Sequence, residues 1–207
     1  MRIITISPRG FGANTYVLTA DGKTAVVIDP AQPRVESELI RLGLKAEYVL
    51  LTHCHFDHVG GVAALRSAGA KVLCSTAEKP LIGTAADLFE AFGAPRTPFR
   101  VDETLSDGET RNFCGIEIRT LFTPGHTRGG ACYLATDTDG KKYLFTGDTL
   151  FAGSIGRTDF PTGDIGELRE SLKRLAALDG DMPVYAGHND ETTLDTERRT
   201  NPFLQDL

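Results

Sequence analysis

The histidines of this chain all lie at positions suited to holding a metal ion. Three of its five histidines fall in one short run that also holds an acidic residue, namely His53, His55, Asp57 and His58. The other two, His126 and His188, lie far downstream, and each follows a glycine that lets the backbone approach a neighbour closely. Imidazole nitrogen and carboxylate oxygen are ligands that zinc and similar cations prefer. The sequence therefore predicts a metal centre.

The short run is able to serve two ions. His53 and His55 are alternate residues of an extended segment, so both side chains can face one ion. The chain must turn at Asp57 and His58, which then face a neighbouring point. Each ion still needs ligands from elsewhere in the chain, since about four bonds per ion are usual. The two downstream histidines are the natural completions.

Two aspartates at the ends of predicted strands complete the set of candidates. Asp148 follows the run Phe145-Thr146-Gly147, and its two carboxylate oxygens make it the best candidate to touch both ions. Asp29 ends another predicted strand. It either orients a ligand imidazole from behind or caps a turn, and the sequence leaves both roles open.

The elements that must position these residues alternate between strands and helices. Apolar, β-rich runs predict strands over residues 2–6, 15–18, 25–28, 48–51, 71–74, 100–105, 110–112, 116–121, 132–135, 143–145 and 184–186. Helices are predicted over residues 35–42, 62–67, 77–92 and 165–178, the last with Asp164 as its N-cap. Each half of the chain thus runs from strands into helix. This order favours an α/β architecture of two packed sheets with helices outside.

Composition excludes several other classes of protein. The net charge of −6 argues against a nucleic-acid partner, which would need clustered Lys and Arg. No apolar stretch approaches the length that spans a bilayer, and the N-terminus lacks the apolar core of a signal peptide. The four cysteines are scattered, which fits a reducing compartment. We therefore expect a cytoplasmic protein without a membrane partner that acts on a small molecule.

Taken together, these residues resemble the metallo-β-lactamase fold superfamily, whose mark is H-x-H-x-D-H followed by distant His, Asp and His. The resemblance covers nearly the whole chain. It implies a four-layer αβ/βα sandwich, formed as a single domain over residues 1–207, with the metal site at the edge shared by the two sheets. It assigns His53, His55 and His126 to one ion. It assigns Asp57, His58 and His188 to the second ion, with the carboxylate of Asp148 bridging the two.

Within that superfamily the chain is most similar to glyoxalase II-like hydrolases, which cleave hydroxyacylglutathione thioesters. The runs 52–61, 123–127 and 145–153 carry this likeness, and the segments 156–161 and 197–204 resemble the short bacterial branch, which lacks the C-terminal helical domain. The chain departs from the usual pattern at Cys54, Arg128, Gly130 and the residues after His188. These departures concern recognition of glutathione more than metal binding.

The resemblance implies a hydrolase with two divalent cations. Zinc is expected, and iron or manganese suit the same ligands. Cations about 3.5–4 Å apart can share a water and lower its pKa, so that a bridging hydroxide attacks the thioester carbonyl. We expect Asp57 to orient this nucleophile. Arg157 matches a position where the family uses a basic side chain for the glycine carboxylate of glutathione; a salt bridge to Asp159 or Asp164 is the alternative role.

Other activities of the same superfamily stay open. The principal alternative is a mononuclear-iron persulfide dioxygenase, which the runs 52–55 and 156–160 also resemble. A diiron electron-transfer protein is disfavoured because that branch usually carries Glu at the position of His55. The segment 77–99 either covers the site or only packs against it. The sequence does not indicate an oligomeric state.

Overall fold

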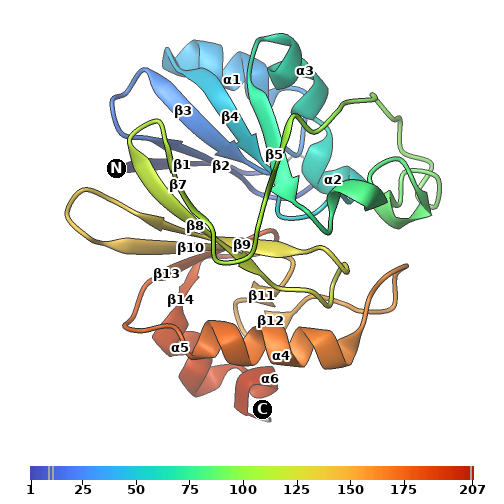
Figure 1. Ribbon diagram of the computed structural model, residues 1–207, viewed down its shortest axis with the longest axis vertical. Helices are drawn as coiled ribbons and strands as arrows, with labels where there is room; N and C mark the ends of the chain where they lie inside the picture. Colours follow the sequence, from blue (N-terminus) through green and yellow to red (C-terminus); the bar gives the residue numbers. More distant parts are fainter. Residues whose placement is uncertain (9, 11, 206) are drawn as a thin grey trace.

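The computed structural model describes residues 1–8, 10, 12–205 and 207. Two six-stranded sheets lie face to face, with helices on their outer surfaces (Figure 1). The first sheet has the order β1 (Arg2–Ile6), β2 (Thr15–Thr19), β3 (Thr24–Ile28), β4 (Lys45–Leu50), β5 (Lys71–Ser75) and β6 (Glu103–Leu105). The second has the order β14 (Thr192–Thr193), β13 (Pro183–Ala186), β10 (Lys142–Gly147), β9 (Ala131–Thr136), β8 (Ile116–Phe122) and β7 (Thr110–Phe113).

Strand direction determines which loops meet. Strands β3, β4, β5 and β6 are parallel, so the loops after them leave the first sheet at one edge. In the second sheet β10 and β13 are parallel, and β8 runs in the same direction because it pairs antiparallel with β9, as β10 does. The loops after β8, β10 and β13 therefore also leave at one edge. Every candidate metal ligand lies on a loop of this kind.

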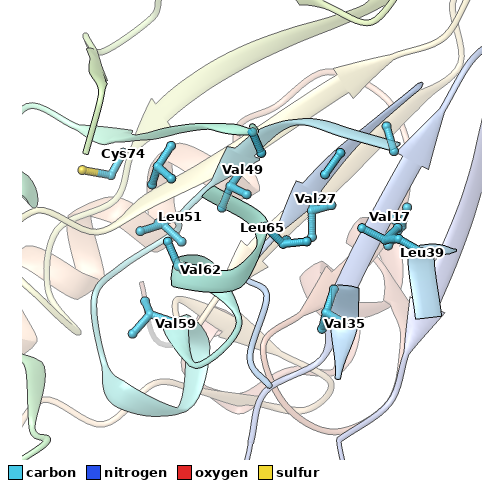
Figure 2. Packing of buried hydrophobic residues seen from close by; sticks show 14 of the residues in the cluster. Val17, Val27, Val35, Leu39, Val49, Leu51, Val59, Val62, Leu65 and Cys74 are labelled. Atoms are coloured by element: carbon cyan, nitrogen blue, oxygen red, sulfur yellow. The ribbon is translucent and has the colours of Figure 1, made fainter. Parts of the chain in front are cut away.

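Three apolar layers hold four layers of secondary structure together. In β3 the side chain of Val27 packs toward the helices, whereas Val26 and Ile28 pack toward the second sheet. Figure 2 shows the outer layer, in which Val27 and Val49 from the strands pack near Leu39 and Leu65 from the helices. The central layer joins both sheets, and the third joins the second sheet to α4 (Ile165–Ala176) through Leu168, Leu172 and Leu175. The predicted αβ/βα sandwich is confirmed.

The helices are short except for α4. The first sheet is covered by α1 (Val35–Leu42), α2 (Phe56–Val59) and α3 (Val62–Ser67), and the chain finishes with α5 (Leu194–Thr200) and α6 (Pro202–Gln205). Asp164 caps α4 as predicted, accepting a hydrogen bond from the backbone N–H of Glu167 at 2.9 Å. No described helix is both long and apolar enough to cross a membrane.

The predicted helix over residues 77–92 is wrong. This segment forms two single 3₁₀ turns, Lys79–Leu81 and Ala85–Asp87, joined by a bend. Gly83 has a φ of 84° and Leu88 a φ of 64°, and such left-handed residues interrupt an α-helix. The apolar residues of the segment do not share one helical face, because Leu81 and Ala86 pack together, Phe89 packs in the outer apolar layer, and Phe92 stacks on Phe56.

Candidate metal centre

The loops that follow five strands bring the predicted ligands and Asp29 to one edge of the sandwich. The run from His53 to His58 follows β4 and includes α2, while Asp29 follows β3. From the second sheet, the loops after β8, β10 and β13 carry His126, Asp148 and His188. The helical turn of α2 was not predicted, because four residues are too few for a periodic pattern.

A first group of three side chains is buried. The ligand atoms of His53, His55 and His126 all lie within 4.8 Å of one another, and all three residues are buried. Nδ1 of His55 and Nε2 of His126 face each other at 3.0 Å. Three imidazole nitrogens directed at one point are a donor set suited to a divalent cation.

A second group lies beside the first and is more open. Asp57, His58 and His188 also have ligand atoms within 4.8 Å of one another. Nε2 of His188 lies 3.2 Å from Oδ2 of Asp57. The His58 side chain is fully buried, whereas that of His188 is 32% exposed. An approaching molecule therefore meets the second group first.

Asp148 contacts both groups. One of its carboxylate oxygens lies 3.3 Å from Nε2 of His58, and the other lies 3.5 Å from Nε2 of His126 and 3.5 Å from Nε2 of His188. This is the arrangement that the predicted bridging role requires.

Three of the imidazoles have a hydrogen-bond partner at Nδ1, on the side of the ring away from the centre. Nδ1 of His58 donates to Asp29 at 2.9 Å, and Nδ1 of His126 donates to the backbone carbonyl of Arg157 at 2.7 Å. Thr52 donates its hydroxyl to Asp29, so its oxygen accepts from Nδ1 of His53 at 3.1 Å. These contacts at Nδ1 orient each ring so that its Nε2 atom is directed toward the centre.

Four buried polar atoms at this point have no hydrogen-bond partner among the described residues: Nε2 of His53, Nε2 of His55, Nε2 of His58 and Oδ1 of Asp148. A buried polar atom without a partner destabilises a fold by about 1–3 kcal/mol. Nε2 of His53, Nε2 of His58 and Oδ1 of Asp148 belong to residues of the two groups or to the carboxylate between them, and each of these atoms would gain a bond at a cation site. The residues present therefore suit metal ions.

The electrostatics of the centre are those of crowded imidazoles beside carboxylates. Burial, followed by the charge of neighbouring histidines, lowers the pKa of His53 well below its usual value and that of His55 to about 3. Burial also acts to lower the pKa of His58, but Asp148 and Asp57 outweigh it and raise that pKa. Burial would raise the pKa of Asp148, yet His58 and the other imidazoles hold it below the usual range. Both carboxylates of the centre are therefore ionised at neutral pH.

Asp29 has the supporting role that the sequence had left open. Besides His58, its carboxylate accepts hydrogen bonds from the backbone N–H of Thr52 at 2.8 Å and from the Thr52 hydroxyl at 2.5 Å. Asp29 is itself close to His53 and His58. Its oxygens are occupied on the Nδ1 side of His58, however, which makes it a partner of a ligand rather than a ligand.

Glu78 is a buried carboxylate that the sequence did not single out. It accepts hydrogen bonds from the backbone N–H of Cys54 and from the hydroxyl of Thr127, each at 2.8 Å. These two residues neighbour His55 and His126, so Glu78 joins the two loops that form the first group. Burial raises the pKa of Glu78 above its usual value, and its hydrogen bonds oppose that rise.

The loop of His188 is held by the start of β2. Asn14 donates to the backbone carbonyls of Ala186 at 3.2 Å and Asn189 at 3.1 Å, and the backbone N–H of Ala13 donates to the carbonyl of Asp57 at 3.0 Å. Both contacts of Asn14 join residues more than 100 positions apart in sequence, which is why this support could not be predicted from a local pattern.

Cys54 points away from the candidate ligands. Its side chain packs with Leu81 and Ala86, and burial raises the pKa of its thiol well above the usual value. No cysteine belongs to the ligand groups found among the described residues. Cys74 and Cys132 are also buried, as expected for small apolar residues, whereas Cys114 is partly exposed.

A cavity of about 740 Å³ opens over the centre. Asp57, Asp148 and His188 lie on its floor, and Arg157 is among its lining residues. The guanidinium of Arg157 forms two hydrogen bonds with Asp159, each of 2.6 Å, which is the salt bridge considered above as its alternative role. The pair is more than half exposed, so its position is compatible with both roles.

Comparison with known proteins identifies the family. A model described as the metallo-beta-lactamase superfamily matches residues 8–188. The chain belongs to this superfamily. Among its relatives, the hydroxyacylglutathione hydrolase GloC of Haemophilus influenzae is 35% identical over 99% of this chain and 98% of its own length.

Solved structures of the metallo-β-lactamase fold agree closely with this member of the superfamily. BLEG-1, described as a B3 metallo-beta-lactamase, has a TM-score of 0.89 and 32% identity, covering 98% of this chain and 99% of its own. TTHA1623, solved in a di-iron-bound form, has a TM-score of 0.82 and 36% identity, covering 99% of this chain and 100% of its own. The family and fold predicted from the sequence are confirmed, whereas these names point to different activities and metals.

Proposed function

We propose that this metallo-hydrolase is a thioesterase acting on thioesters of the hydroxyacylglutathione type. The observation that carries the proposal is the convergence of two ligand groups, joined by Asp148, beneath a cavity wide enough for a small-molecule substrate. The likeness to a hydroxyacylglutathione hydrolase along the full chain supports this substrate class over other hydrolase substrates.

The two groups would hold two divalent cations, with His53, His55 and His126 at one and Asp57, His58 and His188 at the other. Such cations polarise a carbonyl oxygen and lower the pKa of water. We propose zinc as the metal, and the di-iron form of a relative makes iron the first alternative.

Asp57 is proposed as the residue that orients the nucleophile. Burial acts to raise the pKa of its carboxyl, but the charge of His58 and the hydrogen bond from His188 outweigh burial and lower it. The carboxylate is therefore ionised and accepts hydrogen bonds only. Its side chain is 20% exposed and faces the cavity, so it can accept a hydrogen bond from a water that approaches a bound carbonyl.

The described cavity residues include no carboxylic acid that could protonate a leaving group, and this favours a thioester as the substrate. Among the described lining residues the carboxylates are Asp57 and Asp148, both ionised, and the three lining histidines, His55, His126 and His188, would be held by the cations. A thiolate departs readily without a proton from the protein, because its conjugate thiol has a pKa of roughly 8.5. Amide or ether substrates would require a proton donor.

The experiment is hydrolysis of S-lactoylglutathione by protein loaded with zinc, followed by release of the free thiol. Removal of the metal with a chelator should abolish turnover, and returning zinc should restore it. Undiminished activity in metal-free protein would end the proposal. A β-lactam assayed in parallel should turn over far more slowly than the thioester, and the reverse order would assign a different activity.

Two measurements on the same sample distinguish the thioesterase from the alternative, a mononuclear-iron persulfide dioxygenase. Counting metal ions per chain and recording oxygen uptake with glutathione persulfide should give two ions and no uptake. One iron per chain with oxygen consumption would favour the dioxygenase.

A further inference from the structure

One wall of the cavity over the metal centre is built from aromatic rings, and we define it as the aromatic wall of Phe56, Phe92 and Phe160. The rings of Phe56 and Phe92 are stacked, with centroids 5.0 Å apart and planes inclined by 27°. Phe92 meets Phe160 edge to face at 5.8 Å. Three residues from separate segments of the chain thus form one continuous apolar surface.

The aromatic wall reaches the candidate ligands directly. The ring of Phe160 meets that of His55 edge to face at 5.9 Å. Phe160 therefore lies beside the candidate ligands, where the carbonyl carbon of a bound thioester would react. The substituent on that carbonyl carbon would then lie against the ring of Phe160.

The ring of Phe92 is the part of the aromatic wall that is most open to solvent. The residue is 55% exposed, although it is supported from behind by Phe56. Leaving a large ring exposed beside a cavity forgoes the stabilisation that its burial would supply. A ligand with an apolar group would cover this ring and recover part of that stabilisation.

The charged side chain that contacts the aromatic wall, Arg157, already has a partner. The guanidinium of Arg157 lies 4.0 Å from the centroid of the Phe160 ring and is paired with Asp159. It covers one face of the Phe160 ring, and Asp159 balances its charge. Ser154 and Asn189 also line the cavity, and their polar groups suit the amides of a peptide thiol.

We propose that the aromatic wall binds the acyl group of the substrate, and that this acyl group is apolar, either aryl or branched alkyl. Phe92 and Phe160 are then specificity-determining residues. This inference rests on the proposed thioesterase function for its reaction, but the wall itself is a binding surface that can be tested without turnover.

The kinetic test compares two thioesters that differ in one group, S-mandeloylglutathione, with a phenyl, and S-lactoylglutathione, with a methyl. In the zinc-loaded enzyme the ratio of their kcat/KM values is measured for wild type, Phe92→Ala, Phe160→Leu and the control Phe203→Ala. Phe203 is a similarly exposed phenylalanine, 46% exposed, on α6. The ratio should favour mandeloyl and fall roughly tenfold in both wall variants, the usual scale for one aromatic contact, but not in Phe203→Ala.

A binding test keeps the outcome separate from that of the proposed function. Calorimetric titration of the zinc-loaded protein with mandelate and with lactate should show tighter binding of mandelate, with that advantage lost in Phe92→Ala. If no thioester is hydrolysed but the mandelate advantage depends on Phe92, the thioesterase fails and the apolar site stands. A preference unchanged by both wall variants, or lowered equally by Phe203→Ala, overturns the inference.

Discussion

The carboxylate of Asp29 lies 2.9 Å from Nδ1 of His58, opposite the Nε2 atom that faces Asp148 at 3.3 Å. Asp29 has a φ of 48°, a conformation uncommon for a residue with a side chain. It is maintained here by the hydrogen bonds from Thr52. The backbone at the end of β3 thus holds a carboxylate in the place that fixes the tautomer of a candidate ligand.

This relationship predicts the effect of Asp29→Asn. The amide removes the negative charge behind His58 and weakens the preference for the tautomer with a free Nε2. Metal affinity should fall by about 10–100-fold, the usual cost of losing such a partner. Competition with a chromophoric chelator measures it, with the exposed Asp139→Asn as matched control. Equal affinities in the two variants would contradict the orienting role.

The close packing around Gly187 predicts that a substitution there releases metal, although no ligand residue is replaced. A methyl group at this position would overlap the carboxylate of Asp148 and lie 2.8 Å from Cε1 of His58. We expect Gly187→Ala to retain its circular dichroism spectrum but to lose at least one ion per chain. Gly166→Ala, in α4, is the control, since only the flexible side chain of Asp164 lies close to it. Full metal content in Gly187→Ala would contradict this prediction, because the side chains of Asp148 and His58 would then have moved aside without losing metal.

Glu78 predicts a pH dependence of stability in the metal-free protein. Its folded-state pKa is raised, so its contribution to folding is fully present below the ordinary value and is lost as pH rises through the folded value. Glu78→Gln preserves the shape and removes this titration. The free energy of unfolding of the variant, relative to wild type, should therefore improve between pH 4 and pH 8. Parallel pH profiles from denaturant titrations would exclude a titrating Glu78.

The candidate ligands were predictable because metal binding restricts residue types strongly. Few side chains besides His and Asp could serve at these positions, and the ligands from His53 to His58 lie within one loop. Helix α4 was predictable for a similar reason, since Leu168, Leu172 and Leu175 repeat at helical spacing on its buried face.

The supporting residues could not be predicted because their partners are distant in sequence. Glu78 lies in a polar stretch beside Lys79 and would pass for a surface residue. Asn201 was noticed only as part of a resemblance, yet its buried amide donates to the carbonyls of Phe151 and Ser154. These contacts hold the small hairpin of β11 (Leu150–Phe151) and β12 (Ser154–Ile155) over the cavity. Strands of two residues leave no pattern in a sequence.

Arg157 allows the thiol portion of the substrate to be tested. If its guanidinium meets the glycine carboxylate of glutathione, Arg157→Ala should raise KM for S-lactoylglutathione roughly tenfold, the scale of one charged hydrogen bond, with kcat nearly unchanged. The same variant should not alter KM for the lactoyl thioester of N-acetylcysteamine, which lacks that carboxylate. An unchanged KM for the glutathione substrate would leave Arg157 as the partner of Asp159 and Phe160 only.

The most direct measurement is the metal content of the purified protein by elemental mass spectrometry, after loading with zinc and removal of weakly bound ions. Wild type should hold two ions per chain, and His188→Ala should hold one, because the enclosed group of His53, His55 and His126 remains intact. Wild-type protein that retains no ion, or only one, would contradict the paired centre on which the account depends.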